Sequence, residues 1–226
     1  MKIKLIVATR ESEDNFFLKT ATGRSIAFNL PPLFELKLFA NNTRGLPSIY
    51  NEAIRECANN PATIVFAHDD LHILDFFWVS RLKEGLTYFD IIGLAGNKRR
   101  VPKQPSWAFI DTKFTWDSQE NLSGIVGHGK GYPASNLSIF GAPRQKVKLL
   151  DGLLIASESQ TLLKNDLFFD ENFTFHFYDL DFCRQAEQKE LACGTWDLSI
   201  IHESGGNFGS EGWRIAYQQY LEKWKE

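Results

Sequence analysis

The sequence contains little cysteine and no long apolar run. Its three cysteines, Cys57, Cys183 and Cys193, are odd in number and include no C-x-x-C pair. This argues against a disulfide framework and favours reduced core residues in a reducing, cytoplasmic location. No apolar stretch approaches the roughly 20 residues that a transmembrane helix needs. We therefore expect no transmembrane segment, while peripheral association with a membrane stays open.

The sequence also lacks a strong excess of either charge. With 25 Lys and Arg against 28 Asp and Glu, its formal net charge is −3, so we expect no nucleic-acid partner. The length of 226 residues suits a single α/β domain, with room for one insertion and a sizeable core. Composition excludes little else, and the function has to be read from motifs.

The most informative stretch is the apolar run Ile64–Ala67, which is followed by His68, Asp69 and Asp70. A short apolar run with β-branched residues predicts a buried central strand of an α/β sheet. Ligands in such sheets bind beyond the carboxyl ends of the strands, where two carboxylates can hold a divalent cation that carries a diphosphate. Asp69 and Asp70 can equally be turn or helix-capping residues, so this stretch alone leaves both interpretations open.

Strands and helices are predicted to alternate through the first hundred residues. Apolar runs predict strands over 3–8, 33–39 and 89–95 in addition to the central one. Apolar residues at helical spacing predict an amphipathic helix over 46–58, and a further helix is expected over 75–84. This βαβ series predicts a largely parallel sheet.

The segment 99–146 is rich in glycine and proline and has little sustained periodicity. We interpret it as a loop-rich insertion, or lid, of one domain spanning 1–226 rather than as a second domain. Within it, Gly124–Gly131 resembles the phosphate-binding G-x-x-x-x-G-K motif. No Ser or Thr follows Lys130, however, and Tyr132-Pro133 prevents a helix from opening there. We therefore reject a P-loop and expect a flexible glycine loop.

Two further groups of polar residues lie in the last third of the chain. Asp179 and Asp181 begin a predicted helix, where carboxylates suit the helix dipole and can act simply as caps. A predicted strand over 196–201 ends in His202, which is either a metal ligand or a satisfied polar residue. A last helix, with a core-packing aromatic stripe, is expected over 212–224.

Taken together, these residues resemble a known family. An apolar strand ending in Asp69-Asp70, a late strand ending in His202 and the helix start Tyr178-Asp179-Leu180-Asp181-Phe182-Cys183 are similar to the GT-A nucleotide-sugar glycosyltransferases, family 2 in particular. The resemblance covers most of the chain, and 99–146 is its least matched part. It implies an α/β fold with a single GT-A-type, Rossmann-like domain, whose mostly parallel central sheet is flanked by helices.

The resemblance also implies an activity. Such enzymes move a sugar from a nucleoside-diphosphate donor, here a UDP- or GDP-sugar, to a saccharide or other hydroxyl acceptor, as in polysaccharide biosynthesis. A metal-assisted single displacement needs one carboxylate as base and inverts the anomeric centre, so an inverting glycosyltransferase is expected. Sugar-nucleotide pyrophosphorylases have a similar fold but need a glycine-rich loop after the first strand, and Ala8–Ser12 contains no glycine.

Residue roles follow from the resemblance position by position. Asp70 and His202 are expected to bind Mn²⁺ or Mg²⁺, and a mixed carboxylate and imidazole set suits Mn²⁺ somewhat better. Asp179 is expected to be the catalytic base, with Asp181 as the alternative. Contacts to the nucleotide, the sugar or the acceptor are expected from Thr9, Arg10, Asn51, Asp69, Asp70, Asp151 and Gly152.

Two positions depart from the family pattern. His68 occupies the first position of the D-x-D motif, and Tyr178 occupies the position of the Glu that precedes the catalytic Asp. These departures keep open a non-catalytic protein of the same fold, which binds a nucleotide sugar or a glycan without turning it over.

Overall fold

The computed structural model describes residues 2–28 and 33–226, and within them the strands form two sheets. The first has seven described strands in the order β2-β1-β3-β11-β5-β12-β9, with bounds β1 Lys2–Ala8, β2 Glu35–Phe39, β3 Ala62–Ala67, β5 Ile91–Gly93, β9 Lys146–Val147, β11 Leu154–Glu158 and β12 Cys193–Thr195. Strands β1, β2, β3, β5 and β12 run in one direction, and β9 and β11 oppose them. The predicted, mostly parallel central sheet is therefore confirmed, although the antiparallel β11 lies at its middle.

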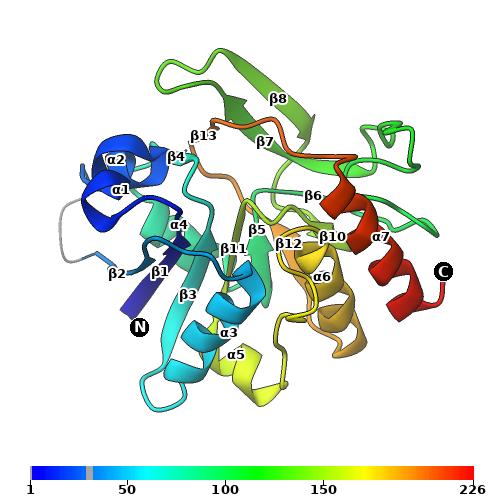
Figure 1. The fold of residues 1–226 in the computed structure, drawn as a ribbon, viewed down its shortest axis with the longest axis horizontal. Coiled ribbons are helices and arrows are strands. Elements are labelled where there is room, and N and C mark those ends of the chain that lie inside the picture. The colour runs from blue at the N-terminus through cyan, green and yellow to red at the C-terminus, as the bar shows by residue number, and fades with distance from the viewer. Residues whose placement is uncertain (1, 29–32) are drawn as a thin grey trace.

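Strand β3 is buried along its whole length, from Ala62 to Ala67, so it needs a layer on each face. Helices α3 (Leu46–Glu56) and α5 (Ser159–Lys164) cover one face, and α4 (Trp78–Gly85) lies behind the other (Figure 1). The helix predicted over 46–58 is confirmed. The helix predicted over 75–84 begins later, because the Asp75 carboxylate accepts the Phe77 N–H in a turn at 2.8 Å.

A second sheet lies beyond the carboxyl ends of β3, β5 and β12. Its six described strands follow the order β10-β6-β7-β13-β4, with β8 paired to β7, and have the bounds β4 Leu71–Ile73, β6 Ala95–Asn97, β7 Leu122–His128, β8 Asn136–Gly141, β10 Leu149–Leu150 and β13 Ile200–His202. The chain passes directly from the first sheet to the second at β3–β4, β5–β6 and β12–β13. Residues between these strands are therefore held at the junction of the two sheets.

This junction explains two errors in the predicted strands. The run 89–95 is divided between β5 and β6, because the chain changes sheets at Leu94. The run 196–201 is not one strand either. Strand β12 ends at Thr195, and pairing resumes only at Ile200, now against β4 and β7 of the second sheet.

The segment 99–146 is more regular than its composition predicts. It contains β7 and β8, which form a hairpin, so the expectation of a flexible glycine loop is wrong for Gly124–His128. A Cβ on Gly124 would meet the Leu94 carbonyl oxygen at 2.2 Å, which shows that this glycine serves close strand packing. No helix follows Lys130, in agreement with the rejection of a P-loop.

A buried carboxylate anchors the first part of that segment. Asp117 accepts hydrogen bonds from Asn97 at 2.9 Å, Arg99 at 2.9 Å and Asn121 at 3.0 Å. Burial alone would raise the pKa of Asp117, but these hydrogen bonds outweigh it and hold the pKa well below its usual range. The loop from 97 to 121 is therefore fastened to the second sheet.

The remaining helices are α1 (Glu13–Lys19), α2 (Ala21–Ile26), α6 (Tyr178–Gln188) and α7 (Glu211–Trp224). The Ser12 and Ser210 side chains cap α1 and α7 by accepting N–H bonds, which satisfies donors of the first turn. The stripe of α7 is buried at Trp213, Ala216 and Tyr220, so the predicted core face is confirmed. Among the described residues, no helix is both long enough and apolar enough to span a membrane.

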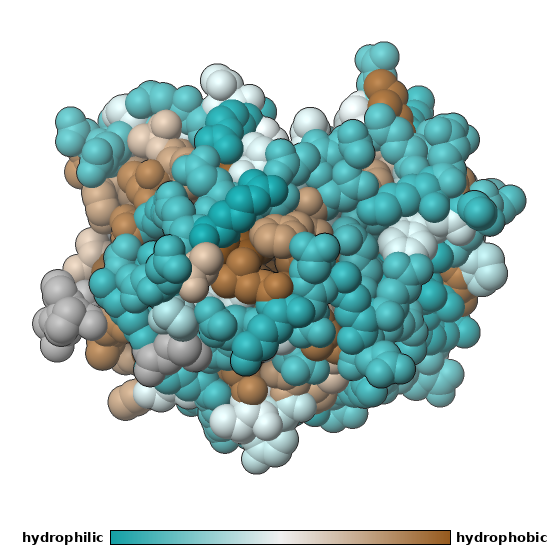
Figure 2. All heavy atoms as spheres, turned by 90° about the horizontal axis from the view of Figure 1, so that it is seen from below, coloured by the Kyte–Doolittle hydropathy of each residue, from teal (hydrophilic) through white to brown (hydrophobic). Residues whose placement is uncertain are grey.

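The surface and the interior divide as the composition suggests. The three cysteines are buried and unpaired, as predicted. Seen from below, the molecule is mostly hydrophilic, and apolar atoms show at the bottom of a hollow near the centre of that face (Figure 2).

Candidate functional site

Helix α2 fixes the turn that joins β3 to β4. The buried Thr22 hydroxyl hydrogen-bonds to the His68 carbonyl at 2.7 Å and accepts the Leu71 N–H at 3.3 Å. The backbone N–H of Thr22 also donates to the Asp69 carbonyl at 3.0 Å. One residue thus satisfies three backbone groups of the turn, which leaves the Asp70 side chain in a defined position.

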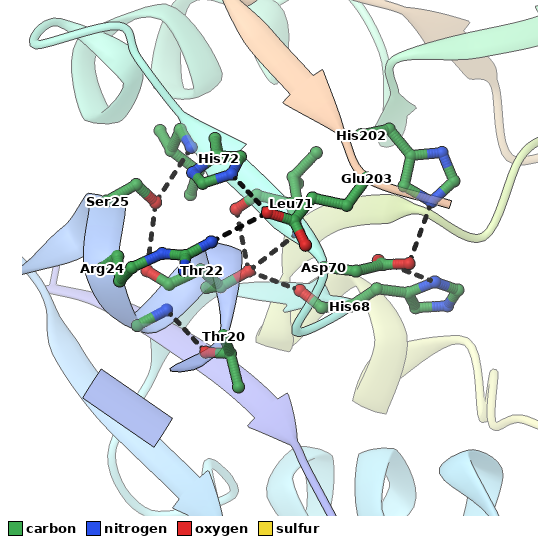
Figure 3. A network of polar contacts seen from close by, with 12 residues as sticks. Thr20, Thr22, Arg24, Ser25, His68, Asp70, Leu71, His72, His202 and Glu203 are labelled. Atoms are coloured by element: carbon green, nitrogen blue, oxygen red, sulfur yellow. Dashed lines mark hydrogen bonds and ion pairs between the residues drawn. The ribbon is translucent and has the colours of Figure 1, made fainter. Parts of the chain in front are cut away.

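Strand β13 brings His202 to the same turn. The Glu203 N–H donates to the Asp70 carbonyl at 3.0 Å. The Glu203 carboxylate is held by Arg24 at 2.8 Å and lies 2.8 Å from the His72 ring (Figure 3). With its neighbour fixed in this way, His202 places Nε2 at 3.2 Å from Asp70 Oδ2. The predicted convergence of these two residues is present, although they follow strands of different sheets.

His68, Asp70 and His202 form a cluster whose ligand atoms lie within 4.8 Å of one another. The two imidazole rings flank the carboxylate (Figure 3). Asp70 Oδ1 is buried without a hydrogen-bond partner, and His68 Nδ1 lies 4.0 Å from it, too far for a hydrogen bond. A buried carboxylate oxygen without a partner is costly, and this donor set suits a divalent transition metal. The residues fit a cation, and we did not predict His68 as a ligand because it breaks the D-x-D pattern.

The protonation states of two of the three residues in the cluster suit a metal. Burial opposes ionisation of Asp70, but the hydrogen bond from His202 and the nearby imidazoles lower its pKa to about 2. Burial likewise opposes the charged form of His202, yet its hydrogen bond to Asp70 raises its pKa. For His68 burial prevails and lowers the pKa. Metal ligands must be deprotonated, and Asp70 and His68 meet this condition near neutral pH.

The start of α6 carries the second part of the site. Phe177 precedes the helix with a left-handed φ of 65°, an unusual conformation for a bulky residue. Its ring packs against Trp213, Tyr217 and Tyr220 of α7, with centroid distances of 5.3–5.5 Å. Packing against α7 therefore stabilises the left-handed backbone conformation of Phe177. This residue leads into the first turn of α6, which carries Tyr178 and Asp179.

Asp179 is held by backbone donors. Its carboxylate accepts the Gly152 N–H and the Leu180 N–H, each at 2.9 Å. Burial of the side chain, followed by the nearby charge of Asp151, raises the pKa of Asp179 to about 7. A carboxyl group with this pKa can take up a proton near neutral pH, as a general base must.

Tyr178 links Asp179 to the cluster. Its hydroxyl donates to the Gly152 carbonyl at 2.9 Å and lies 3.0 Å from His68 Nε2. A Cβ on Gly152 would approach that hydroxyl to 2.3 Å, so only glycine fits between the loop and α6. The Asp151-Gly152 pair, which we predicted from the resemblance, is thus packed directly on the helix start.

A cleft of about 670 Å³ opens at this junction. Its lining includes Asp70, Asp151, Gly152, Asp179 and His202. The structure therefore brings together five of the predicted site residues, from both sheets and from α6. His68 joins them, and a set of aromatic side chains from 105–140 and from the C-terminal part forms the facing wall.

Five other predicted residues do not line the cleft. The prediction for Asn51 is not supported, because its buried side-chain amide bonds the Phe169 backbone and the Glu171 carboxylate. Thr9 is buried at the end of β1 beside Asp69, whose pKa rises mainly through burial. Arg10 is exposed.

Asp181 points away from the cleft and is fully buried. It accepts the Trp224 indole N–H at 2.9 Å and the Gln185 amide at 2.7 Å, and it pairs with Lys223 at 2.7 Å. The contacts made by Asp181 fasten α7 to α6, which is a structural task.

Comparison with known proteins was informative at the level of structure alone. No protein family and no curated protein matches the sequence. The structure of S. aureus TarS in complex with UDP matches at a TM-score of 0.52 and 14% identity, over 90% of this chain and 61% of that one. GalNAc-T7 with UDP, GalNAc and Mn²⁺ matches at 0.60 and 10% identity, over 98% of this chain and 48% of that one. These neighbours are GT-A glycosyltransferases.

The chain has the GT-A fold. A second structure of S. aureus TarS agrees, with a TM-score of 0.52 and 15% identity over 100% of this chain and 43% of that one. At such identities the likeness concerns the fold alone. The chain spans 43–61% of the length of these three structures.

The two aspartates of α6 should respond differently to substitution. Asp181→Ala should lower the free energy of unfolding by about 2–4 kcal/mol, because it leaves Lys223 and Trp224 without a buried acceptor. Asp179→Asn should change it by less than about 1 kcal/mol. Urea unfolding measures both, with Asp170→Ala as the control that removes the other, partly exposed carboxylate on Lys223. A folded Asp181→Ala protein with unchanged stability would contradict the structural role.

Proposed function

We propose that this protein is an inverting, metal-assisted glycosyltransferase that moves a sugar from a UDP- or GDP-sugar to an acceptor hydroxyl. One observation carries the proposal: the His68–Asp70–His202 cluster and Asp179, with its pKa of about 7, share one cleft of a GT-A fold. The complexes of TarS with UDP and of GalNAc-T7 with UDP, GalNAc and Mn²⁺ support a nucleotide-sugar donor and a cation such as Mn²⁺ or Mg²⁺. The family resemblance alone suggests polysaccharide biosynthesis in the cytoplasm.

The cleft makes the cation essential to this proposal. Among the described residues that line it, there is no Lys or Arg. A cation held by His68, Asp70 and His202 therefore supplies the positive charge that neutralises the departing diphosphate. The residues that hold it are fixed in advance by Thr22 and Glu203, so little reorganisation is needed.

Asp179 is the proposed base. It takes the proton of the acceptor hydroxyl as the acceptor oxygen bonds to the anomeric carbon and the bond to the diphosphate breaks. The Gly152 and Leu180 N–H groups orient its carboxylate. A single displacement with one base inverts the anomeric centre.

We also propose a lid, but only a part of the segment 99–146 is assigned to it. Asp117 fastens the loop from 97 to 121, so we propose that the β7–β8 hairpin is the part of 99–146 that closes over the cleft. His128, Asn136 and Ser138 of this hairpin already line the cleft. Closure would exclude water, which otherwise hydrolyses the donor.

Nucleotide binding should depend strictly on the metal. Calorimetry should detect binding of UDP or GDP with Mn²⁺ and far weaker binding without it, because the described residues that line the cleft include no Lys or Arg to replace the cation. Asp70→Ala combined with His202→Ala should weaken the metal-dependent binding by about 10²-fold or more. Asp14→Ala, an exposed carboxylate of α1, is the control and should bind normally. Unchanged binding by the double variant would refute the metal site.

The pH dependence of transfer should report Asp179. Because its pKa is raised, the carboxylate loses its proton only as the pH passes about 7, so kcat/KM should rise about tenfold per pH unit below that point and then level off. An ordinary aspartate would give a flat profile in the same range. Asp179→Asn should lower turnover by roughly 10²-fold or more while nucleotide binding persists.

Two results would change the assignment. Near-normal transfer by folded Asp179→Asn would exclude it as the base. Tight metal-dependent nucleotide binding without transfer to any acceptor would favour the alternative function, a non-catalytic nucleotide-sugar or glycan-binding protein.

A further inference from the structure

An aromatic wall, formed by Trp107, Trp116 and Phe140, faces the acceptor side of the cleft. Trp116 is 54% exposed although it lines the cleft. Its ring stacks on Phe140 at a centroid distance of 5.8 Å and an interplanar angle of 21°. Trp107 packs edge-on against Phe140 at 4.9 Å. A large aromatic face held rigidly and left open is a surface for stacking a ligand.

The wall is tied to the proposed base. The Trp107 indole N–H donates to Asp151 at 2.7 Å. Asp151 precedes Gly152, whose N–H binds Asp179. The wall and the proposed base are therefore joined through the Asp151-Gly152 pair within one cleft.

The permanently charged side chains among the described residues that line this region are all acidic. The carboxylates that line the cleft are Asp70, Asp151, Asp179 and Glu203, and no Lys or Arg lies among the described lining residues. Asp70 pairs with His202 and Glu203 with Arg24. By contrast, the hydrogen bonds that Asp151 and Asp179 accept come from neutral N–H groups. The acceptor side thus keeps negative charge next to the aromatic wall.

We propose, building on the proposed function, that the acceptor is an uncharged saccharide that stacks on the aromatic wall. The C–H face of a sugar ring suits an exposed indole, and its hydroxyl groups can donate to Asp151 and Asp179. A phosphate or uronate on the acceptor would approach two carboxylates in a partly desolvated cleft, where like charges repel strongly. The charge of the cleft therefore selects against anionic acceptors.

Binding of matched saccharide pairs tests this proposal. Each pair consists of a neutral oligosaccharide and the same oligosaccharide oxidised at C6 to uronates. Both members are displayed on a glycan array, and binding of the protein is measured in the presence of Mn²⁺ and UDP. Neutral members should bind about tenfold or more tightly than their oxidised partners. Trp116→Ala should abolish the binding, and Tyr88→Ala, which removes a still more exposed aromatic side chain that does not line the cleft, should not affect it.

The failure of this inference can be told apart from failure of the proposed function. If UDP binds with Mn²⁺ but the oxidised members bind better, or no neutral saccharide binds, the acceptor class is wrong. Equal binding by Trp116→Ala would remove the wall from recognition. Absence of UDP binding itself would instead refute the proposed function.

A second inference rests on a different observation, the hydrogen bonds of Tyr178. The Gly152 carbonyl can only accept, so the hydroxyl proton of Tyr178 is donated to it at 2.9 Å. The Tyr50 ring lies edge-on to the Tyr178 ring at a centroid distance of 5.9 Å, but its hydroxyl is buried without a hydrogen-bond partner and so does not take the Tyr178 proton. His68 Nε2, at 3.0 Å from the Tyr178 oxygen, must therefore be the donor of that contact.

This assignment fixes the other ring nitrogen. A neutral imidazole with its proton on Nε2 carries a lone pair on Nδ1. His68 Nδ1 faces Asp70 Oδ1 at 4.0 Å, and that oxygen is buried without a hydrogen-bond partner. Two electron-pair donors therefore face one gap, which is the arrangement that a shared cation requires.

We propose that Tyr178 is a positioning residue that selects the Nε2–H tautomer of His68 and so presents Nδ1 to a divalent cation. The two departures from the family pattern, His68 and Tyr178, then act together. His68 replaces a carboxylate ligand, and Tyr178 supplies the hydroxyl that orients it. Partners of this kind tune metal affinity without touching the metal.

Nitrogen-15 NMR of histidine-labelled protein tests the tautomer without metal or donor. At mildly alkaline pH, His68 should show a protonated Nε2 and an unprotonated Nδ1. In Tyr178→Phe this preference should disappear, and Mn²⁺ affinity measured by electron paramagnetic resonance should fall by about tenfold or more. Tyr220→Phe, which removes another buried hydroxyl that does not line the cleft, should keep both properties.

Each outcome decides the point. A His68 proton on Nδ1 in the unsubstituted protein would overturn the inference directly. A normal tautomer and normal Mn²⁺ affinity in Tyr178→Phe would leave Tyr178 a packing residue. If the tautomer changes in Tyr178→Phe but neither protein binds Mn²⁺, the positioning role holds for the ring alone and the metal site of the proposed function fails.

Discussion

The pairing of β13 with the turn after β3 is the constraint on which this site depends. The Glu203 N–H bonds the Asp70 carbonyl, and His202 bonds the Asp70 carboxylate. Thr22 of α2 holds the opposite side of the same turn. These contacts join three distant parts of the chain, so the cluster exists only when both sheets have formed. Asp70 Oδ1 is left without a hydrogen-bond partner and faces His68 Nδ1 at 4.0 Å, which leaves the gap that a cation would fill.

The first turn of α6 illustrates how the surroundings of a side chain divide function from structure. Asp179 and Asp181 are two residues apart and therefore face different directions. Asp181 meets Lys223 and Trp224 and is enclosed by α7. Asp179 meets backbone N–H groups at the edge of the cleft, where burial and Asp151 raise its pKa to about 7. Removal from water raises the pKa of both carboxyls, but only Asp179 lies where a substrate can reach it.

The balance of charge in the cleft gives the site its chemical character. The described lining of the site contains no Lys or Arg to neutralise a diphosphate. Its carboxylates instead favour a cation, and its aromatic wall favours a neutral ring. Both features arise because acidic and aromatic side chains are brought together at the junction of the two sheets.

The sequence by itself determined the local elements. The apolar run before Asp70 and the helical spacing over 46–58 each depend on neighbours along the chain, and each appears as predicted. Resemblance of short motifs to a family also indicated Asp70, Asp151, Gly152, Asp179 and His202 as site residues, and the fold brings them to one cleft. Tertiary structure alone decided which polar residues remain available. The side chains of Asn51 and Asp181 are hydrogen-bonded inside the protein and are not available to a ligand. The His68 ring is positioned as a proposed metal ligand by its contact with Tyr178. Such roles depend on contacts between residues more than one hundred positions apart, or on which helix covers a side chain, and no local pattern records them.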